Sequence, residues 1–161
     1  MYEIAYLNLS YKNGNVGIGR TPTTNKLEVE GTASKTTAGE WIANSDFMIK
    51  TDVMDIKDAL AKIENLRPVR FKYASDYRLK HPSIKDRYYY NFIAQEFGKV
   101  FPDAVSNSGE GYLQLDTYLV TPYLVASVKE LAEKNEELSK ENLEVKRKLS
   151  QLEEKVASLE K

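Results

Sequence analysis

The chain has 161 residues, with 23 basic and 24 acidic side chains and a net charge of −1. This length suits one modest globular domain with an appendage, not two full domains. The balanced charge gives no indication of a nucleic-acid partner or an anionic membrane surface. The sequence contains no cysteine, which excludes disulfides, thiolate metal sites and cysteine nucleophiles.

The other simple signals also indicate an assembly protein without a cofactor. His81 is the single histidine and cannot build a metal site alone. It precedes Pro82 in a hydrophilic stretch, so we expect it to be an exposed loop residue. No apolar run approaches the ~20 residues that a membrane span needs, and the N-terminus does not read as a secretion signal. We therefore expect no metal, no cofactor and no membrane partner.

Residues 1–44 have the pattern of short strands and turns. Apolar and polar side chains alternate at period two over residues 7–12, and Asn13-Gly14 predicts a tight turn. Short strand segments follow at residues 16–19 and 27–30. So few apolar residues cannot close a core in one chain, so we expect the β-rich end of a stalk in which several chains wrap around each other. A disordered linker is the alternative.

Residues 45–118 are expected to form a compact α+β domain that opens with a helix. Ile56, Leu60 and Ile63 are spaced 4 and 3 apart, which predicts an amphipathic helix. We expect the acidic residues at positions 52 and 55 to open this helix and Pro68 to follow its end.

The rest of this domain is predicted to contain short strands and one short helix. Residues 69–73 and 88–92 both alternate as half-buried strands, and the two could pair across the loop 74–87. Residues 95–100 read as a short helix, and residues 112–115 as a further strand. The fold class is therefore α+β, a small mixed domain with a short antiparallel sheet.

Residues 119–161 are predicted to form one long helix with a coiled-coil seam. Apolar or asparagine side chains recur at two positions of each heptad over five heptads. The seam comprises Leu124, Val128, Leu131, Asn135, Leu138, Asn142, Val145, Leu149 and Leu152, and the repeat continues to Val156 and Leu159. A helix packed back on its own domain is the alternative, but the repeat is longer than a small domain is wide.

Asn135 and Asn142 are polar residues at seam positions. Such asparagines weaken a coiled coil but fix its register, which favours a parallel, in-register assembly. The heptads by themselves leave both a dimer and a trimer open.

Two segments carry a serine and a lysine five positions apart, a combination that can act as nucleophile and general base. They are Ser45 with Lys50 and Ser75 with Lys80. No nucleotide-binding loop competes with them, because the glycines of residues 14–19 lack the following lysine and helix. The tyrosines 88–90 are assigned to strand packing.

The order of further motifs resembles one family. Leu66-Arg67-Pro68-Val69-Arg70-Phe71-Lys72-Tyr73 is followed by Phe92-Ile93-Ala94-Gln95-Glu96, Phe101-Pro102-Asp103-Ala104-Val105 and Lys129-Glu130-Leu131. From Ser45 to Glu130 the chain resembles the self-cleaving intramolecular chaperones at the C-termini of phage endosialidases, tail fibres and neck appendages.

The resemblance implies which residues act. The family's serine lies upstream of the helix and of the Pro-Val-x-Phe strand, which selects Ser45 over Ser75. Ser45 would attack the carbonyl of Asn44, and Lys50 would take the hydroxyl proton. Asp46, Gln95 and Glu96 are the supporting motif residues. The chain departs from the family pattern at Met48, where the motif has arginine.

The resemblance also implies the function. The chain would be a chaperone that forms a homotrimer, aligns its own upstream stalk and is released by a single self-cleavage between Asn44 and Ser45. Assembly would take place in the host cytoplasm, with the upstream protein ending in the virion tail. A permanent structural cap with an inactive Ser-Lys pair is the first alternative, and a host-binding tip that uses the tyrosines is the second.

Overall fold

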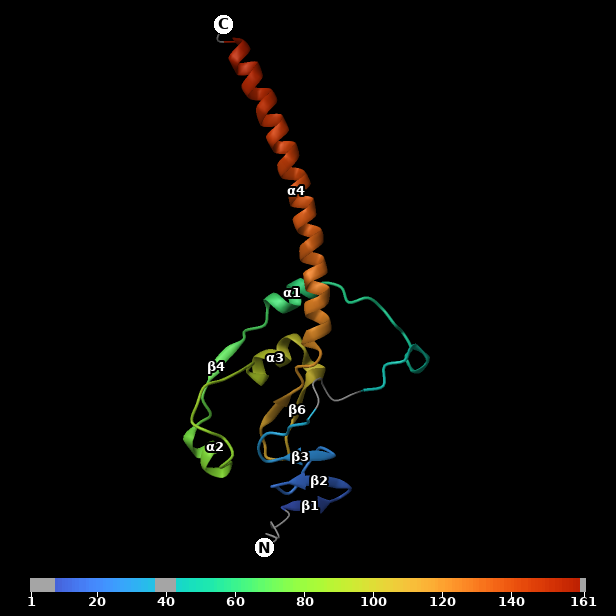
Figure 1. The fold of residues 1–161 in the computed structure, drawn as a ribbon, viewed down its shortest axis with the longest axis vertical. Helices are drawn as coiled ribbons and strands as arrows, with labels where there is room; N and C mark the ends of the chain where they lie inside the picture. Colours follow the sequence, from blue (N-terminus) through green and yellow to red (C-terminus); the bar gives the residue numbers. More distant parts are fainter. Residues whose placement is uncertain (1–7, 37–42, 160–161) are drawn as a thin grey trace. The chain divides into compact units, whose positions relative to one another are not determined.

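The structure is a computed structural model that describes residues 8–36 and 43–159. The chain divides into two compact units, one of Met1–Val53 with Leu66–Asp116 and one of Met54–Asn65 with Thr117–Lys161. Short sheets and helices in the first unit and a long C-terminal helix in the second confirm the α+β class (Figure 1).

The first unit begins with a three-stranded sheet of β1 (Leu9–Lys12), β2 (Asn15–Ile18) and β3 (Leu27–Val29). β1 and β2 pair antiparallel, and β2 and β3 pair parallel. Asn13 and Gly14 join the first two strands with positive φ angles of 53° and 80°, as a two-residue hairpin turn requires. The β-rich character expected of this segment is confirmed, although residue 7 lies outside the described residues.

A buried carboxylate holds the connection between β2 and β3. Glu28 is 8% exposed and accepts hydrogen bonds from the backbone N–H groups of Thr23, Thr24 and Asn25 at 2.7–2.9 Å. Burial alone would raise the pKa of Glu28, but these three N–H groups and the Thr23 hydroxyl lower it to about 2. The loop is therefore built around an ionised side chain.

The remainder of the first unit consists of short elements. In chain order they are η1 (Phe47–Ile49), β4 (Val69–Phe71), α2 (Ser75–Lys80), β5 (Tyr89–Asn91), α3 (Ala94–Val100), η2 (Pro102–Ala104), β6 (Val105–Asn107) and β7 (Leu113–Leu115). β4 pairs antiparallel with β5, and β6 pairs antiparallel with β7. These elements confirm the predicted strand pair, the short helix and the strand near residue 113, and the connection between β4 and β5 contains α2.

Aromatic rings form most of the interior of this unit. Phe97 is 1% exposed and lies 5.2 Å from the ring of Phe92 and 5.4 Å from that of Phe101. A second group joins Tyr73 to Tyr77 and Tyr89 at ring distances of 5.1–5.5 Å. Offset and edge-to-face rings at such distances add stability beyond their buried area.

The second unit contains α1 (Ala59–Glu64) and α4 (Val120–Leu159). The prediction that the helix opens at residues 52–55 was wrong, because α1 begins only at Ala59. Asp52 and Asp58 both have a φ of 53°, in the left-handed region, and a residue there cannot continue a right-handed helix. Asp58 makes no side-chain cap, and the Glu130 carboxylate accepts the N–H groups of Ala59 and Leu60 instead.

The helix α4 is a single element of 40 residues, or about 60 Å at 1.5 Å per residue, and Figure 1 shows it as an uninterrupted rod in orange and red. In the single chain its seam is exposed: Leu138, Leu149 and Leu152 are 57%, 54% and 58% accessible. Charged residues flank the seam, and among the described helices none is long and apolar enough to cross a membrane.

Candidate functional site

Ser45 and Lys50 are brought together by a short turn of helix. The Lys50 Nζ donates a hydrogen bond of 2.6 Å to the Ser45 Oγ. Asp46 begins the 3-10 turn η1, because its carboxylate accepts the backbone N–H of Met48 at 2.7 Å. The turn closes when the Lys50 N–H bonds the carbonyl of Phe47. The compact turn thus spans the four residues between the expected nucleophile and the expected base.

The same segment is open to solvent. Asn44, Ser45 and Lys50 are all exposed, and Met48, at the position of the motif arginine, is 90% exposed. In this geometry the lysine amine and the serine hydroxyl share one hydrogen bond at an open surface. Exclusion of water would favour the neutral amine that proton abstraction needs.

The competing pair, Ser75 and Lys80, lies at the two ends of α2. Residues five apart on an α-helix, at 3.6 residues per turn, point about 140° away from each other. Arg78 of this segment pairs with Asp86 at 3.2 Å. This serine and lysine therefore do not face each other in a shared site.

Gln95 and Glu96, assigned to the supporting motif, lie in the first turn of α3. Gln95 is exposed. Glu96 accepts two hydrogen bonds from the guanidinium of Arg67, at 2.9 and 2.5 Å. These bonds lower the pKa of Glu96. The contacts of Glu96 thus fasten α3 to the segment that leads into β4.

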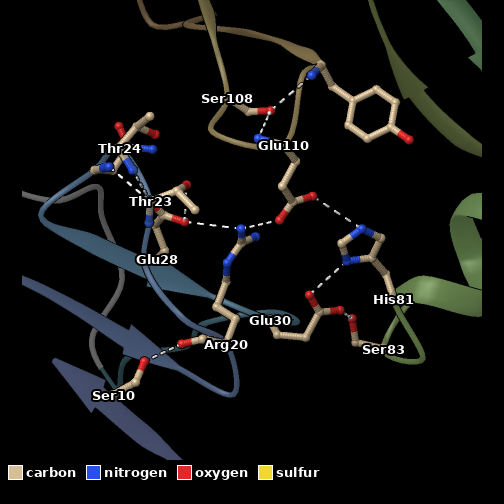
Figure 2. A network of polar contacts seen from close by, with 12 residues as sticks. Ser10, Arg20, Thr23, Thr24, Glu28, Glu30, His81, Ser83, Ser108 and Glu110 are labelled. Carbon is tan, nitrogen blue, oxygen red and sulfur yellow. Dashed lines mark hydrogen bonds and ion pairs between the residues drawn. The ribbon is translucent and has the colours of Figure 1, made fainter. Parts of the chain in front are cut away.

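His81 lies in the loop after α2, as predicted, but the prediction that its side chain is exposed was wrong. Its side chain is only 12% exposed, and its ring packs 4.3 Å from the ring of Tyr77. The Nδ1 atom lies 3.0 Å from Glu30 Oε2 and the Nε2 atom 3.4 Å from Glu110 Oε2. Figure 2 shows the imidazole between the two carboxylates. The sequence gives no local sign of this cluster, since its members are 29 and 51 positions from His81.

Arg20 extends the same network. Its guanidinium contacts Glu28 at 3.2 Å and pairs with Glu110, as Figure 2 shows. Glu30 also accepts a hydrogen bond of 2.5 Å from the Ser83 hydroxyl. The bonds from Ser83 and His81 lower the pKa of Glu30. The network therefore places three carboxylates around one arginine and one histidine.

The other predicted positions are distributed along α4. The seam residues, including Asn135 and Asn142, are exposed from residue 131 to 159. In the part of the chain that the structure describes, no three His, Cys, Asp or Glu side chains are grouped closely enough to hold a metal ion. The Tyr88 ring lies under the Arg70 guanidinium at 4.4 Å and under Lys72 at 5.3 Å, so it packs against its own sheet.

The fold and the pair together define a class: a small α+β domain headed by a Ser-Lys pair and followed by a long helix with an exposed heptad seam. A family model described as the chaperone of endosialidase matches residues 45–106. Residues 45–106 therefore match the intramolecular chaperone domain of this family, which is a peptidase family of the self-cleaving serine kind. Among curated proteins, none matches the chain significantly.

Proposed function

We propose that this chain trimerises and folds the stalk of a phage tail spike, tail fibre or neck appendage, and then removes itself by cutting between Asn44 and Ser45. The observation that carries the proposal is the 2.6 Å contact between the Lys50 amine and the Ser45 hydroxyl. The family match begins at residue 45, the position of the expected serine, which supports this choice of nucleophile. Assembly would take place in the host cytoplasm, and the upstream protein would enter the virion tail.

The cut requires one nucleophile and one base. The Ser45 Oγ attacks the carbonyl carbon of Asn44 while its proton passes to the neutral Lys50 amine. The C–N bond breaks, the proton passes to the Ser45 nitrogen, and an ester replaces the peptide bond. Water then hydrolyses the ester to give a carboxylate on Asn44 and a free serine hydroxyl. Correct positioning of neighbouring groups supplies much of the acceleration in such a step.

The single chain is not ready for this reaction, and its surface supports a requirement for assembly. Phe47, Met48 and Ile49, between the serine and the lysine, are 77%, 90% and 64% exposed. Exposed apolar side chains of this density mark an interface. Other copies of the chain that cover η1 would also remove water from Lys50. Trimerisation would thereby favour the neutral amine and start the cut.

The buried core of a single chain supports the same requirement. Among the described residues, the buried apolar side chains larger than glycine are few and include Pro22, Ala59, Phe97 and Phe101. A core of this size is small for a stable domain. The heptad seam of α4 offers a surface that parallel copies can bury. The number three comes from the family resemblance, because the heptads fit two or three strands.

The mass of the purified trimer, followed over time, tests the proposal. The chain of 18.4 kDa should yield a fragment that begins at Ser45, and Ser45→Ala should give an intact trimer of the same melting temperature. Absence of the fragment from a stable trimer of the wild-type chain would contradict the cleavage.

One observation favours a second candidate, a permanent trimeric cap with an inactive pair. Met48 stands at the position of the motif arginine and cannot hold a charge or orient the site. A chain of this kind would trimerise, stay at full length, and make Ser45→Ala indistinguishable from the wild type.

A further inference from the structure

The polar network around His81 joins two segments that the proposed cut would separate. Arg20, Glu28 and Glu30 precede the bond between Asn44 and Ser45, whereas His81, Ser83 and Glu110 follow it. Three contacts cross from one side to the other: Arg20 with Glu110, Glu30 with His81, and Glu30 with Ser83. After cleavage these contacts would be made between two different chains.

The upstream half of this interface is rigidly positioned. The Arg20 guanidinium is held on one side by Glu28, which is itself fixed by three backbone N–H groups. Arg20 therefore presents its other side to Glu110. Glu30 lies directly after β3 and reaches both His81 and Ser83, so the stalk sheet places both charged groups without help from the downstream segment.

The downstream half fits closely against the stalk. Gly109 lies in the turn between β6 and β7, and a Cβ atom at this position would be 2.2 Å from the Thr23 Cβ. Only glycine therefore fits there without displacement of the turn. Tyr77 packs on His81 and also meets Tyr112 at a ring distance of 5.2 Å. The interface thus combines ion pairs with one close steric contact.

We propose that Arg20, Glu30, His81, Ser83 and Glu110 form an ionic clasp that retains the severed stalk on its chaperone, so that release is a separate, salt-sensitive step. The inference rests on the proposed cut between Asn44 and Ser45. The partner that this surface binds is the chain's own upstream fragment. The side chains of Arg20, Glu30 and Glu110 are 23%, 20% and 30% exposed, so water and salt can reach the clasp.

Because the clasp consists of charged and polar side chains, retention of the severed fragment should depend on those charges and on the salt concentration. The screening length of an ionic interaction falls from about 10 Å at 0.1 M salt to about 3 Å at 1 M. Retention should therefore weaken as the salt concentration rises. A clasp made of apolar side chains would be strengthened, or left unchanged, by the same treatment.

The experiment separates cleavage from retention. In the full-length Ser45→Ala variant, a recognition sequence for a specific protease is inserted between positions 44 and 45. The cut then does not depend on the chain's own chemistry. After digestion, size-exclusion chromatography at about 0.1 M and about 1 M salt shows whether the upstream fragment elutes with the chaperone. The wild-type chain is assayed in parallel by denaturing electrophoresis, which reports self-cleavage alone.

We expect retention at the lower salt concentration and release at the higher one. Glu30→Gln and Glu110→Gln keep the size of each side chain and remove its charge, and each should release the fragment roughly 3- to 10-fold faster at low salt. Asp86→Asn is the matched control, because Asp86 pairs with Lys72 and Arg78 on the same side of the cut. Gly109→Ala should speed release at both salt concentrations, because its effect is steric.

Immediate loss of the fragment at the lower salt concentration would overturn the clasp. Equal release rates for Glu30→Gln, Glu110→Gln and the unsubstituted chain would also overturn it, as would retention that 1 M salt leaves unchanged. Failure of the wild-type chain to cut itself would contradict the proposed function but leave the protease-cut assay to decide the clasp.

Discussion

Glu130 accepts a hydrogen bond of 2.9 Å from the backbone N–H of Ala59, which lies 71 positions earlier in the chain. Its second oxygen accepts the N–H of Leu60 at the same distance. The first turn of a helix has N–H groups without intrahelical partners, and a carboxylate there satisfies them and complements the helix dipole. Glu130 thus acts as the cap of α1 from another helix.

Removal of this cap should loosen α1. Glu130→Ala should speed amide hydrogen exchange at Ala59 and Leu60 and lower the melting temperature. Glu141→Ala, at an exposed position of the same helix, is the control. Unchanged exchange at both amides in Glu130→Ala would show that water caps α1 equally well.

The same contact predicts an acid response. The hydrogen bonds from Leu60 and Ala59 lower the pKa of Glu130 from its ordinary value of 4.5. A carboxylate whose pKa is lower in the folded state stabilises the fold above its unfolded pKa. This stabilisation is lost as pH falls through the folded pKa. Protection of the Ala59 and Leu60 amides, measured against their intrinsic exchange rates at each pH, should therefore fall below about pH 4.5 in the wild type, and less so in Glu130→Ala.

Glu28 should remain ionised to much lower pH. Its pKa is about 2 in the folded protein against an ordinary 4.5, so its contribution to stability is complete above pH 4.5 and disappears between about pH 4.5 and pH 2. Nuclear magnetic resonance of the Thr23, Thr24 and Asn25 amides should follow this transition. Glu28→Gln should show no such transition, and an amide titration near pH 4.5 in the wild type would contradict the prediction.

The coiled-coil seam can be tested with two leucines of α4. Leu138→Asp would place one carboxylate from each copy in a buried seam, and each desolvated charge costs several kcal/mol. Light scattering should then show monomers, whereas the proposed trimer of the wild type would have about three times the 18.4 kDa mass of one chain. Leu143 is 75% exposed and lies one position after the seam residue Asn142, so Leu143→Asp should leave the mass unchanged. Equal masses for the two variants would mean that the heptads do not form the interface.

Cleavage should depend on one serine–lysine pair. Lys50→Ala should stop the cut, whereas Ser75→Ala and Lys80→Ala should leave it unchanged, because Ser75 and Lys80 point to different faces of α2. The rate should rise with pH, since only a neutral amine accepts the serine proton. Mass spectrometry of the trimer gives the rate. Loss of cleavage in Ser75→Ala with retention in Ser45→Ala would reverse the assignment.

Met48 should set the speed of the cut. Met48→Arg restores the motif side chain at an exposed position, and the time course of the fragment that begins at Ser45 should accelerate. Met48→Leu keeps the apolar character and should match the wild type. A slower cut in Met48→Arg would mean that the apolar side chain, not a missing charge, serves the site.

Local patterns in the sequence determined much of the fold. The turn at Asn13-Gly14 and the pairing of β4 with β5 follow from spacings and turn chemistry within a few residues, as do the helices α3 and α4. The serine–lysine pair could also be named in advance, through the order of motifs that it shares with a family. Such signals are carried by neighbouring residues, whose geometry is fixed by the period of a strand or a helix.

Only the tertiary structure decided where α1 begins and what His81 does. Apolar spacing placed Ile56 in the helix, but Asp58 adopts a left-handed conformation and Glu130 supplies the cap from 71 positions away. The sequence suggests that His81 is exposed, because Glu30 and Glu110, the two partners that cover it, are distant in the sequence. Hydrogen bonds and ion pairs between distant residues depend on how helices and strands pack, so the spacing of residues within one segment cannot predict them.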